Sequence, residues 1–412
     1  MTRRRVLGAA GAVVGTGLAG CSGTGAESTR TDAGGGAAGA TGSPTATAGE
    51  SEDGSDGAAE SSTSGTSYEA CIEPVGCVEF ASVPETWVAY NGGWADMAFA
   101  LGQADGFRAV GNAVPRFFYE PFDLDLPAAA DTPELFSGGW DEEVFYELDP
   151  DVILMDPEFM HGTGWDGSWD ESDTRELQRN VAPFFGNNCR RRREFHDYEL
   201  YTLYEAFERL ADAFQQRERY EAFAAVHEEV QSTIQSRLPP ASERPSIGLL
   251  NGGSSPQKGQ FFPLDPTAPG YETKPYRDLG VGNAFPASAT GAAIDYERLL
   301  AVDPEILVIH WGIGRTGDGD GFSRAAFREQ YVEPMEDHPV GSQLTAVENR
   351  RVYPGAYGEQ GPITNLLQTE MTAQQLFPEA FGKFDAEAFP AVASERRLFD
   401  RGRVREIVRG EI

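Results

Sequence analysis

One order of segments occurs twice in this chain. The first copy has an apolar run ending in Asn91-Gly92-Gly93, then Leu101-Gly102, then the segment from Asp141 to Met155. The second copy has Asn251-Gly252-Gly253, Leu279-Gly280 and the segment from Asp295 to Ile309, and the third segments lie 154 residues apart. Solenoid repeats have periods of roughly 20 to 50 residues, so this spacing predicts two similar α/β lobes. Two facing lobes form a cleft, which is where small molecules commonly bind.

The hydrophobic pattern predicts the elements of each copy. The first copy is expected to contain a strand over 86–90, a tight turn at 91–93, a helix over 94–101, a strand over 108–110, a helix with the N-cap Asp141 and a strand over 152–155. Long polar loops are expected over 156–173 and 254–273. The second copy starts at Ser246, followed by a late strand over 350–353 and late helices over 362–377 and 395–408. The predicted fold class is α/β, with two Rossmann-like lobes.

One long segment between the copies is predicted to connect them. Residues 200–238 contain no Gly or Pro, and a break near Gln215-Gln216 divides them into two helices. The second helix, 217–238, has a length of about 33 Å at 1.5 Å per residue, which is enough to run from one lobe to the other. We therefore expect an N-terminal lobe over 68–214, one connecting helix over 215–240 and a C-terminal lobe over 241–412.

The N-terminus has the pattern of an export signal. Arginines at positions 3–5 precede the uncharged apolar stretch Val6 to Leu18, which fits a twin-arginine signal and is shorter than the roughly 20 residues of a membrane span. Leu18-Ala19-Gly20-Cys21 fits a lipoprotein processing site with lipidation at Cys21, so residues 1–21 are expected to be a lipoprotein signal. The alternative is an ordinary cleaved signal with a chance cysteine. The predicted location is the extracellular face of the cell membrane.

The segment that follows the predicted signal has the composition of a flexible linker. Residues 22–67 are rich in Gly, Ala, Ser and Thr and lack large apolar residues, so they are expected to be a disordered tether.

The net charge is −32, and only 3 basic residues are lysine. An acidic surface argues against nucleic-acid binding. It favours a cell living in molar salt, where the screening length is about 3 Å; an archaeal extreme halophile is expected, and a merely acidic secreted protein is the alternative.

The chain has four cysteines. Cys71 and Cys77 lie close together before the predicted body, and outside the cell such a pair favours a local disulfide. Their spacing is not C-x-x-C and no second pair follows, which argues against a metal site. Cys189 is expected to be a buried thiol, with a ligand role as the alternative.

Several segments in a fixed order resemble one family. They are the run A-D-M-A-F-A-L-G, the run G-F-R-A-V-G, Glu143-x6-Pro150, Glu297-x6-Pro304, the closing segment Ala346 to Tyr353 and Gly361-Pro362. Together, over roughly Cys77 to Gly382, they resemble the substrate-binding proteins of iron-siderophore and cobalamin ABC importers.

The resemblance implies a fold, a ligand and partners. The fold has two α/β lobes joined by one long helix, and it closes little on its ligand. A monomer would capture a metal chelate, with a ferric siderophore as the first expectation and cobalamin or haem as the second, and deliver it to an ABC permease and its ATPase. Docking would use one acidic residue per lobe, at Glu143 and Glu297. The alternative for both residues is a favourable interaction with the helix dipole, worth about 0.3 to 1 kcal/mol.

Ligands of open α/β sheets bind outside the carboxyl ends of the strands. The candidate ligand contacts placed there are Trp94, His161, Trp165, Trp169, Asn188, Arg190, Trp311, Arg315 and Tyr357. The rings would form an aromatic wall, and one or two of Arg190 to Arg193 would bind carboxylate or catecholate oxygens. His161 and His310 follow equivalent strands and could face each other as ligands of haem iron or of a chelate. The alternatives are core packing of the rings, ordinary loop histidines and a solvated arginine run paired to nearby acids.

The motifs of common enzyme classes are missing from the sequence. It has no G-x-S-x-G elbow, no H-E-x-x-H and no phosphate loop, and its five histidines are scattered. We therefore expect no catalytic activity and no resident cofactor. An extracellular enzyme on a two-lobed scaffold and a receptor for bare metal ions are the remaining alternatives.

Overall fold

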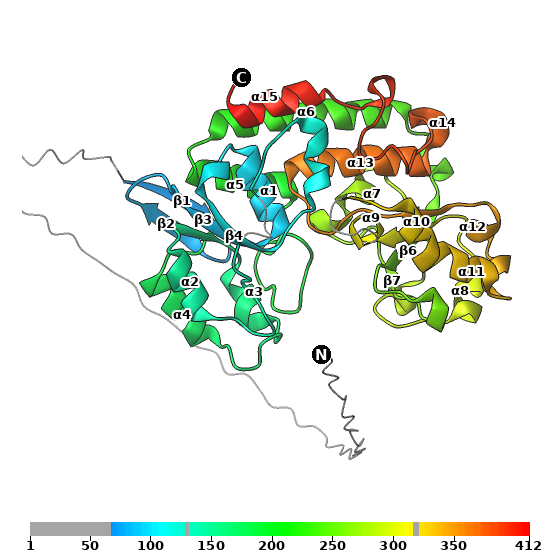
Figure 1. Ribbon diagram of the computed structural model, residues 1–412, viewed down its shortest axis with the longest axis horizontal. Coiled ribbons are helices and arrows are strands. Elements are labelled where there is room, and N and C mark those ends of the chain that lie inside the picture. Colours follow the sequence, from blue (N-terminus) through cyan, green and yellow to red (C-terminus); the bar gives the residue numbers. More distant parts are fainter. Residues whose placement is uncertain (1–66, 128–131, 316–320) are drawn as a thin grey trace, which may run out of the picture. The chain divides into compact units, whose positions relative to one another are not determined.

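The computed structural model describes residues 67–127, 132–315 and 321–412 (Figure 1). The expected lipoprotein signal, Cys21 and the tether up to residue 66 lie outside the described residues. Within the described ranges, no helix combines the length and the apolar character needed to cross a membrane.

The described chain begins with a hairpin that a disulfide closes. Its strands are β1 (Tyr68–Ile72) and β2 (Gly76–Phe80), and they pair antiparallel with Cys71 opposite Cys77. These two cysteines form the expected disulfide. Cys189 is a free, fully buried thiol.

A parallel three-stranded sheet forms the centre of the first lobe. Its strands, in the order β4–β3–β5, are β3 (Trp87–Asn91), β4 (Phe107–Asn112) and β5 (Val152–Leu154). The helices of this lobe are α1 (Gly92–Ala100), α2 (Glu142–Leu148), α3 (Pro157–Gly162), α4 (Glu171–Asn180) and α5 (Leu203–Ala213). Short 3₁₀ turns lie at Ala104–Gly106, Arg116–Phe118 and Glu120–Phe122.

Two expectations for the first lobe were wrong. The Asn91-Gly92-Gly93 segment is not a turn, because α1 begins at Gly92 directly after β3. The polar segment 156–173 is not a long loop, because it contains α3 and the start of α4. Asp156 caps α3 by accepting a hydrogen bond from Glu158 N, and Asp170 forms a capping box with Asp173 at α4.

The connecting segment has the predicted break. α5 ends at Ala213, Gln215 has a positive φ of 51°, and α6 (Arg217–Arg237) follows as a helix of 21 residues. Its buried side chains recur at helical spacing, at Phe223, Val226, Val230 and Ile234.

The second lobe is built around β6 (Ser246–Asn251). This strand pairs in parallel with β8 (Gly282–Asn283) and β9 (Leu307–His310) and antiparallel with β7 (Pro263–Leu264), and β10 (Val352–Pro354) extends the sheet beyond β9. The helices are α7 (Lys274–Asp278), α8 (Tyr296–Val302), α9 (Gly312–Arg315), α10 (Arg324–Phe327), a π-helical turn (Arg328–Val332), α11 (Glu333–Asp337), α12 (Thr345–Glu348), α13 (Pro362–Leu376), α14 (Pro378–Phe381) and α15 (Arg401–Arg409). Further 3₁₀ turns lie at Ala241–Glu243, Pro256–Lys258, Tyr271–Thr273, Ala287–Ala289, Gly341–Gln343 and Ser394–Arg396.

The repeat in the sequence is a repeat in the structure. β3 and β6 are the central strands of the two sheets, and each is flanked by the next two parallel strands of its own copy. α2 and α8 begin at the equivalent caps Asp141 and Asp295, whose side chains accept backbone hydrogen bonds. Both helices end at an aspartate in the left-handed region, Asp149 and Asp303, each with φ of 42°. The α/β class with two similar lobes is therefore confirmed.

Two late helices join the lobes on one side. The side chains of α13 are all buried, and this helix packs against α1 of the first lobe and α7 of the second. α15 packs on α6 and α1, so the end of the chain contacts the first lobe although we placed 241–412 in the second. Figure 1 shows α6, α13 and α15 along one side, with α2 and α8 on the other side of their lobes.

Candidate ligand-binding site

A fully buried carboxylate ties the two lobes together. Glu359 lies between β10 and α13 and is 0% exposed. It accepts hydrogen bonds from Asn91 Nδ2 (3.1 Å), Asn112 Nδ2 (3.0 Å), Arg190 Nη1 (2.8 Å) and Tyr271 OH (2.8 Å). The first three donors belong to the first lobe, so these contacts cross the interface between the lobes.

Arg190 lies between two acids of the second lobe. Its guanidinium donates to Glu359 at 2.8 Å and to Glu272 at 3.2 Å, and it lies 4.8 Å from the ring centre of Trp311. Burial alone would raise the pKa of Glu272, but Arg190 and His310 outweigh it and hold that pKa well below its usual range. A buried charge of this kind is tolerated only when it is paired and hydrogen-bonded.

Glu272 also organises the end of β9. His310 Nε2 lies 3.1 Å from Glu272 Oε1, and Trp311 Nε1 donates to the same oxygen at 3.1 Å. Trp311 has a φ of 69°, a conformation that non-glycine residues adopt mainly where their surroundings enforce it, often at ligand sites. We call Arg190, Glu272, Glu359, Asn91, Asn112, Tyr271, His310 and Trp311 the interlobe network.

An aromatic cluster of the first lobe adjoins this network. The aromatic platform consists of Tyr90, Phe136, Trp140, Phe159 and Trp165, whose ring centres lie 4.9 to 6.5 Å apart in contacting pairs. Trp165 is 44% exposed. Burial and the nearby Glu359 carboxylate raise the pKa of Tyr90 to about 12. The platform therefore extends from the buried network to solvent.

The four consecutive arginines have different environments. Arg190 is buried in the network, and Arg191 Nε lies 3.6 Å from Glu272 with a side chain that is 36% exposed. Arg192 is exposed. Arg193 lies 5.8 Å from the ring centre of Trp165 and so covers the platform. Within the described residues the buried Nε atoms of Arg191 and Arg193 have no hydrogen-bond partner. Both side chains are half-buried, so part of each guanidinium group remains open to a ligand.

Several predicted contacts are part of the first-lobe core instead. Trp94 is 1% exposed and Trp169 is 8% exposed, and the indole of Trp169 donates to Thr174 Oγ1 at 3.0 Å. His161 bonds to Thr174 Oγ1 and Glu158, both at 3.1 Å, whereas His310 bonds within the second lobe. Each histidine thus has the alternative role of an ordinary hydrogen-bonded side chain in its own lobe, and His161 lies on α3 where a loop was expected.

The other predicted contacts lie near the interface. Tyr357 packs against Trp311 with ring centres 4.6 Å apart, and its hydroxyl donates to Ala113 O at 2.9 Å across the lobes. Asn188 is buried, and neither atom of its side-chain amide has a hydrogen-bond partner among the described residues. Arg315 ends α9, and its side chain lies outside the described part of the chain.

The two acids and Tyr90 were not predicted as site residues. Glu359 had a signal in the sequence, because it is the only charged residue between Arg351 and Glu370. An isolated acid in such an apolar stretch is a candidate for burial with a partner. Glu272 had no comparable signal, since charged residues surround it in the sequence.

Glu143 and Glu297 occupy equivalent positions. Both side chains are exposed and lie in the first turn of α2 and of α8. Figure 1 shows these two helices on the side of the lobes away from α6 and α15. One partner surface could therefore meet both residues.

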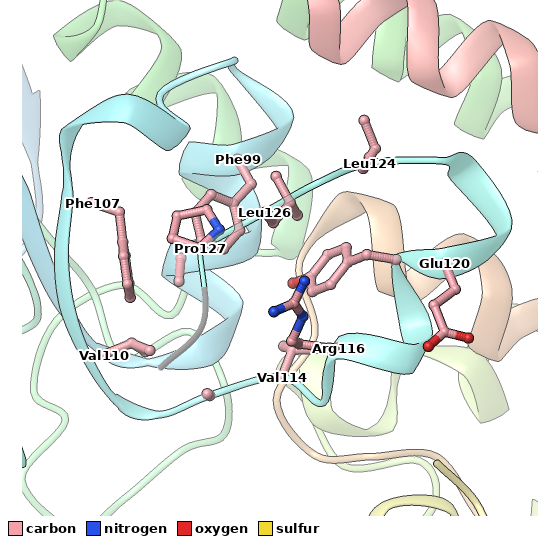
Figure 2. A pocket seen from close by; sticks show the side chains of 12 residues that line it. Phe99, Phe107, Val110, Val114, Arg116, Glu120, Leu124, Leu126 and Pro127 are labelled. Atoms are coloured by element: carbon pink, nitrogen blue, oxygen red, sulfur yellow. The ribbon is translucent and has the colours of Figure 1, made fainter. Parts of the chain in front are cut away.

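A separate cavity lies inside the first lobe. Figure 2 shows Phe99, Phe107, Leu124, Leu126 and Arg116 among its lining residues. Its volume is about 100 Å³, and no residue of the interlobe network lines it. An apolar cavity of roughly 150 Å³ holds a molecule the size of benzene, so this one is too small for a metal chelate.

Comparison with known proteins gives one matching family model, described as periplasmic binding protein. It matches residues 88–355, which is more than half of the chain and runs from β3 to β10. The search of curated proteins returned no match.

Solved structures match the chain over most of its length at low sequence identity. The iron uptake ABC transporter substrate-binding protein PiuA from Streptococcus pneumoniae is 17% identical, with a TM-score of 0.52 over 76% of this chain and 99% of that chain. The siderophore-binding protein BauB, bound to acinetobactin and ferric iron, is 18% identical, with a TM-score of 0.51 over 75% and 98%. CeuE from Helicobacter pylori, in a nickel–histidine complex, is 14% identical, with a TM-score of 0.51 over 77% and 90%. At these identities the likeness concerns the fold.

Proposed function

We propose that this chain, which belongs to the periplasmic binding protein family, captures a metal chelate outside the cell and delivers it to an ABC permease. A ferric siderophore is the proposed ligand. The names of PiuA and BauB, an iron uptake protein and a siderophore-binding protein, support this choice.

One observation carries the proposal. Arg193 lies over the exposed ring of Trp165 and Arg191 lies beside Glu272, so one half-buried guanidinium group contacts the aromatic platform and another contacts the network. Guanidinium groups form forked, charge-assisted hydrogen bonds with anionic oxygens, and the exposed ring offers a flat apolar face. A ferric siderophore presents both an oxygen-rich, anionic metal centre and flat organic groups.

The residues at the interface favour a chelate over a bare metal ion. Glu272 and His310 bond to each other, and Glu359 accepts hydrogen bonds from five donor groups including Arg190. A bare ion would have to displace the Arg190 guanidinium from both carboxylates. Haem and cobalamin fit the platform as flat macrocycles, and they are the second candidates of the same importer class.

Delivery is proposed to use both lobes and a membrane anchor. Glu143 and Glu297 would meet basic residues of the permease, and a lipid on Cys21, after twin-arginine export, would hold the protein at the extracellular face of the membrane. A soluble body close to the permease needs no catalytic site, and we propose that the protein is not an enzyme. A panel of hydrolase substrates tests that part, and turnover of any of them would contradict it.

A tryptophan-fluorescence titration tests the ligand. Purified protein in molar KCl is titrated with a ferric hydroxamate, a ferric catecholate, cobalamin and haemin, with correction for ligand absorbance. We expect saturable quenching by one ferric siderophore, and Trp165→Ala should remove most of the signal. Saturation by haemin or cobalamin alone would replace the proposed ligand, and flat curves for all four with folded protein would remove the chelate proposal.

A pair of adjacent arginines provides the matched control. Arg193→Ala removes the guanidinium over Trp165, whereas Arg192→Ala removes an exposed neighbour with the same charge. We expect about tenfold weaker binding for Arg193→Ala, in line with roughly 1.5 kcal/mol for a hydrogen bond to a charged group, and little change for Arg192→Ala. Equal effects of both changes would mean that only the total charge matters.

A further inference from the structure

A second cavity lies in the other lobe, away from the interface. It has a volume of about 410 Å³, which is within the range of small-molecule sites. Its walls come from α10, the π-helical turn after it, the strand β10 and the segment 383–386. β10 is the edge strand of the second-lobe sheet, and no residue of the interlobe network or the aromatic platform lines this cavity.

The charge of the cavity is opposite to that of the chain. Among the residues that the structure describes, five cationic ones line it, namely Arg324, Arg328, Arg350, Lys383 and Arg396, and two acids do, Glu336 and Asp385. The whole chain carries a net charge of −32. The lining is therefore a local region of positive potential in an acidic protein, which attracts anions.

Two of these cations are paired with acids, and the other three differ from them. Arg324 pairs with Glu387 at 3.1 Å, and Arg328 pairs with Glu336 at 2.9 Å. By contrast, Arg350, Lys383 and Arg396 form no ion pair with any residue that the structure describes. Arg396 Nη1 donates to the carbonyl of Lys383 at 3.1 Å, so these two side chains originate close together.

Aromatic and aliphatic side chains form the rest of the lining. The rings are Phe322, Phe327, Tyr353 and Phe384, and the aliphatic residues include Val332, Val347 and Val352. Phe327 is buried at 3% exposure and packs against Phe322, with ring centres 6.2 Å apart. A solvated cluster of arginines would not need this apolar wall, whereas a ligand with a ring and an acid group would use both.

We propose that this cavity binds a small aromatic carboxylate. Its ring would lie against the phenylalanine side chains, and its carboxylate would accept charge-assisted hydrogen bonds from Arg350, Lys383 or Arg396. Such a site is independent of the proposed metal chelate, because the two sites share no residue. It would let the protein carry or sense a second, metal-free molecule.

Binding of 2-naphthoate to the full-length protein tests this proposal. Isothermal titration calorimetry at low and high KCl should show saturable binding that weakens as chloride rises, because chloride screens and competes for the cations. The uncharged 2-naphthalenemethanol should bind at least tenfold more weakly. Absence of saturable binding at millimolar 2-naphthoate, or equal binding of the alcohol, would overturn the proposal.

Three variants locate the binding site. Lys383→Glu should weaken 2-naphthoate binding at least tenfold, whereas Lys258→Glu makes the same charge change at a lysine of the second lobe outside the cavity and should have little effect. Ala386→Trp fills the cavity without a change of charge and should also abolish binding. Circular dichroism confirms that each variant is folded. Undiminished binding to a folded Ala386→Trp variant would place 2-naphthoate elsewhere and overturn the assignment.

Discussion

The two lobes share a framework but differ in the segment after the central strand. In the first lobe, α1 begins directly after Asn91. In the second lobe, residues 252–273 separate Asn251 from α7, and this segment contains β7 and the turn that carries Tyr271 and Glu272. The repeated part positions the sheets, and the part that differs supplies Tyr271 and Glu272 of the interlobe network. Divergence after a strand end is how one framework can acquire a site for a particular ligand.

Close packing at the start of α1 explains why that part of the first lobe cannot vary in the same way. A Cβ atom on Gly93 would lie 2.7 Å from the ring of Tyr271, and one on Gly92 would lie 2.4 Å from Asn112 O. The glycines let the longer segment of the second lobe contact the first turn of α1. The surfaces of the two lobes therefore fit together at this point because the segments after their central strands differ.

The largest effect is expected when the two proposed docking residues, one in each lobe, are changed together. Reversing charge at Glu143 and Glu297 together should reduce ligand uptake to the level of cells that lack the protein, because both proposed permease contacts become repulsive. Ligand affinity should be unchanged, since both residues are exposed and remote from the network. Uptake of radiolabelled ligand and a binding titration measure the two effects.

Two other exposed acids serve as the control for that experiment. Reversal of Glu147 on α2 and of Glu305 in the second lobe makes the same change of net charge. Uptake should continue in this control. Continued uptake in the Glu143 and Glu297 variant would show that the equivalent positions are only favourable helix-start residues.

The next effect concerns the network that joins the lobes. Glu359→Ala leaves Arg190 buried with one carboxylate fewer, and breaking a buried ion pair in this way costs about 3 to 5 kcal/mol. Guanidinium-induced unfolding should show this loss of unfolding free energy. Glu387→Ala removes an exposed partner of Arg324 and should cost at most about 1 kcal/mol. Similar losses for the two changes would mean that the network does not hold the lobes together.

The pH dependence of the unfolding free energy should reveal the buried acid of α1, Asp96. Asp96 of α1 is fully buried and accepts hydrogen bonds from Ile363 N and Thr364 N at the start of α13, whereas Asp278 of α7 pairs with Lys274 at 2.5 Å. Burial raises the pKa of Asp96 to about 7. Between about pH 4 and pH 7 the folded state therefore keeps a proton that the unfolded state has lost.

The sign of the effect follows from that difference in bound protons. The unfolding free energy contributed by Asp96 should fall as pH rises from about 4 to about 7 and stay low above it, by an amount on the order of 4 kcal/mol. Asp96→Asn should flatten this part of the stability profile, and Glu297→Gln, at an exposed acid, should not. A profile that Asp96→Asn leaves unchanged would contradict the burial argument.

The smallest effect is expected to distinguish two aspartates that have the same backbone conformation. Asp149 and Asp303 both have φ of 42°, but only Asp303 accepts hydrogen bonds from Thr345 N and Oγ1, at 2.8 and 2.7 Å. Asp149→Gly should change the unfolding free energy by less than about 0.5 kcal/mol, because relief of the left-handed backbone is offset by a more flexible unfolded chain. Asp303→Gly should lower it by about 1 to 2 kcal/mol. Equal values from thermal unfolding would contradict this distinction.

The framework could be predicted from the sequence because it depends on local patterns. The caps Asp141 and Asp295, the apolar strands after them and the break at Gln215 all appear in the predicted places. α3 and α4 were missed although Asp156-Pro157 and the pair Asp170 and Asp173 are local cap signals. Their polar and aromatic neighbours lack an apolar periodicity, and such a composition is typical of a loop.

The site was predicted less well because its contacts are long-range. Arg190 and Glu359 are 169 residues apart, and Asn91 and Glu359 are 268 residues apart. Strand ends indicated the right region, but they could not separate the buried Trp94 and Trp169 from the exposed Trp165. That difference depends on how α1 and the segment between α3 and α4 pack on the core, and it requires the packed structure.

The reactivity of the buried thiol of Cys189 can report on the opening of the interface between the lobes. It precedes Arg190, its carbonyl accepts a hydrogen bond from Tyr271 N at 3.0 Å across the lobes, and burial raises its pKa well above the usual range. Thiol reagents react with an exposed thiolate, so Cys189 should react only while this contact is open. Its labelling half-life would then measure how often the lobes separate, and a bound ligand that spans them should lengthen it.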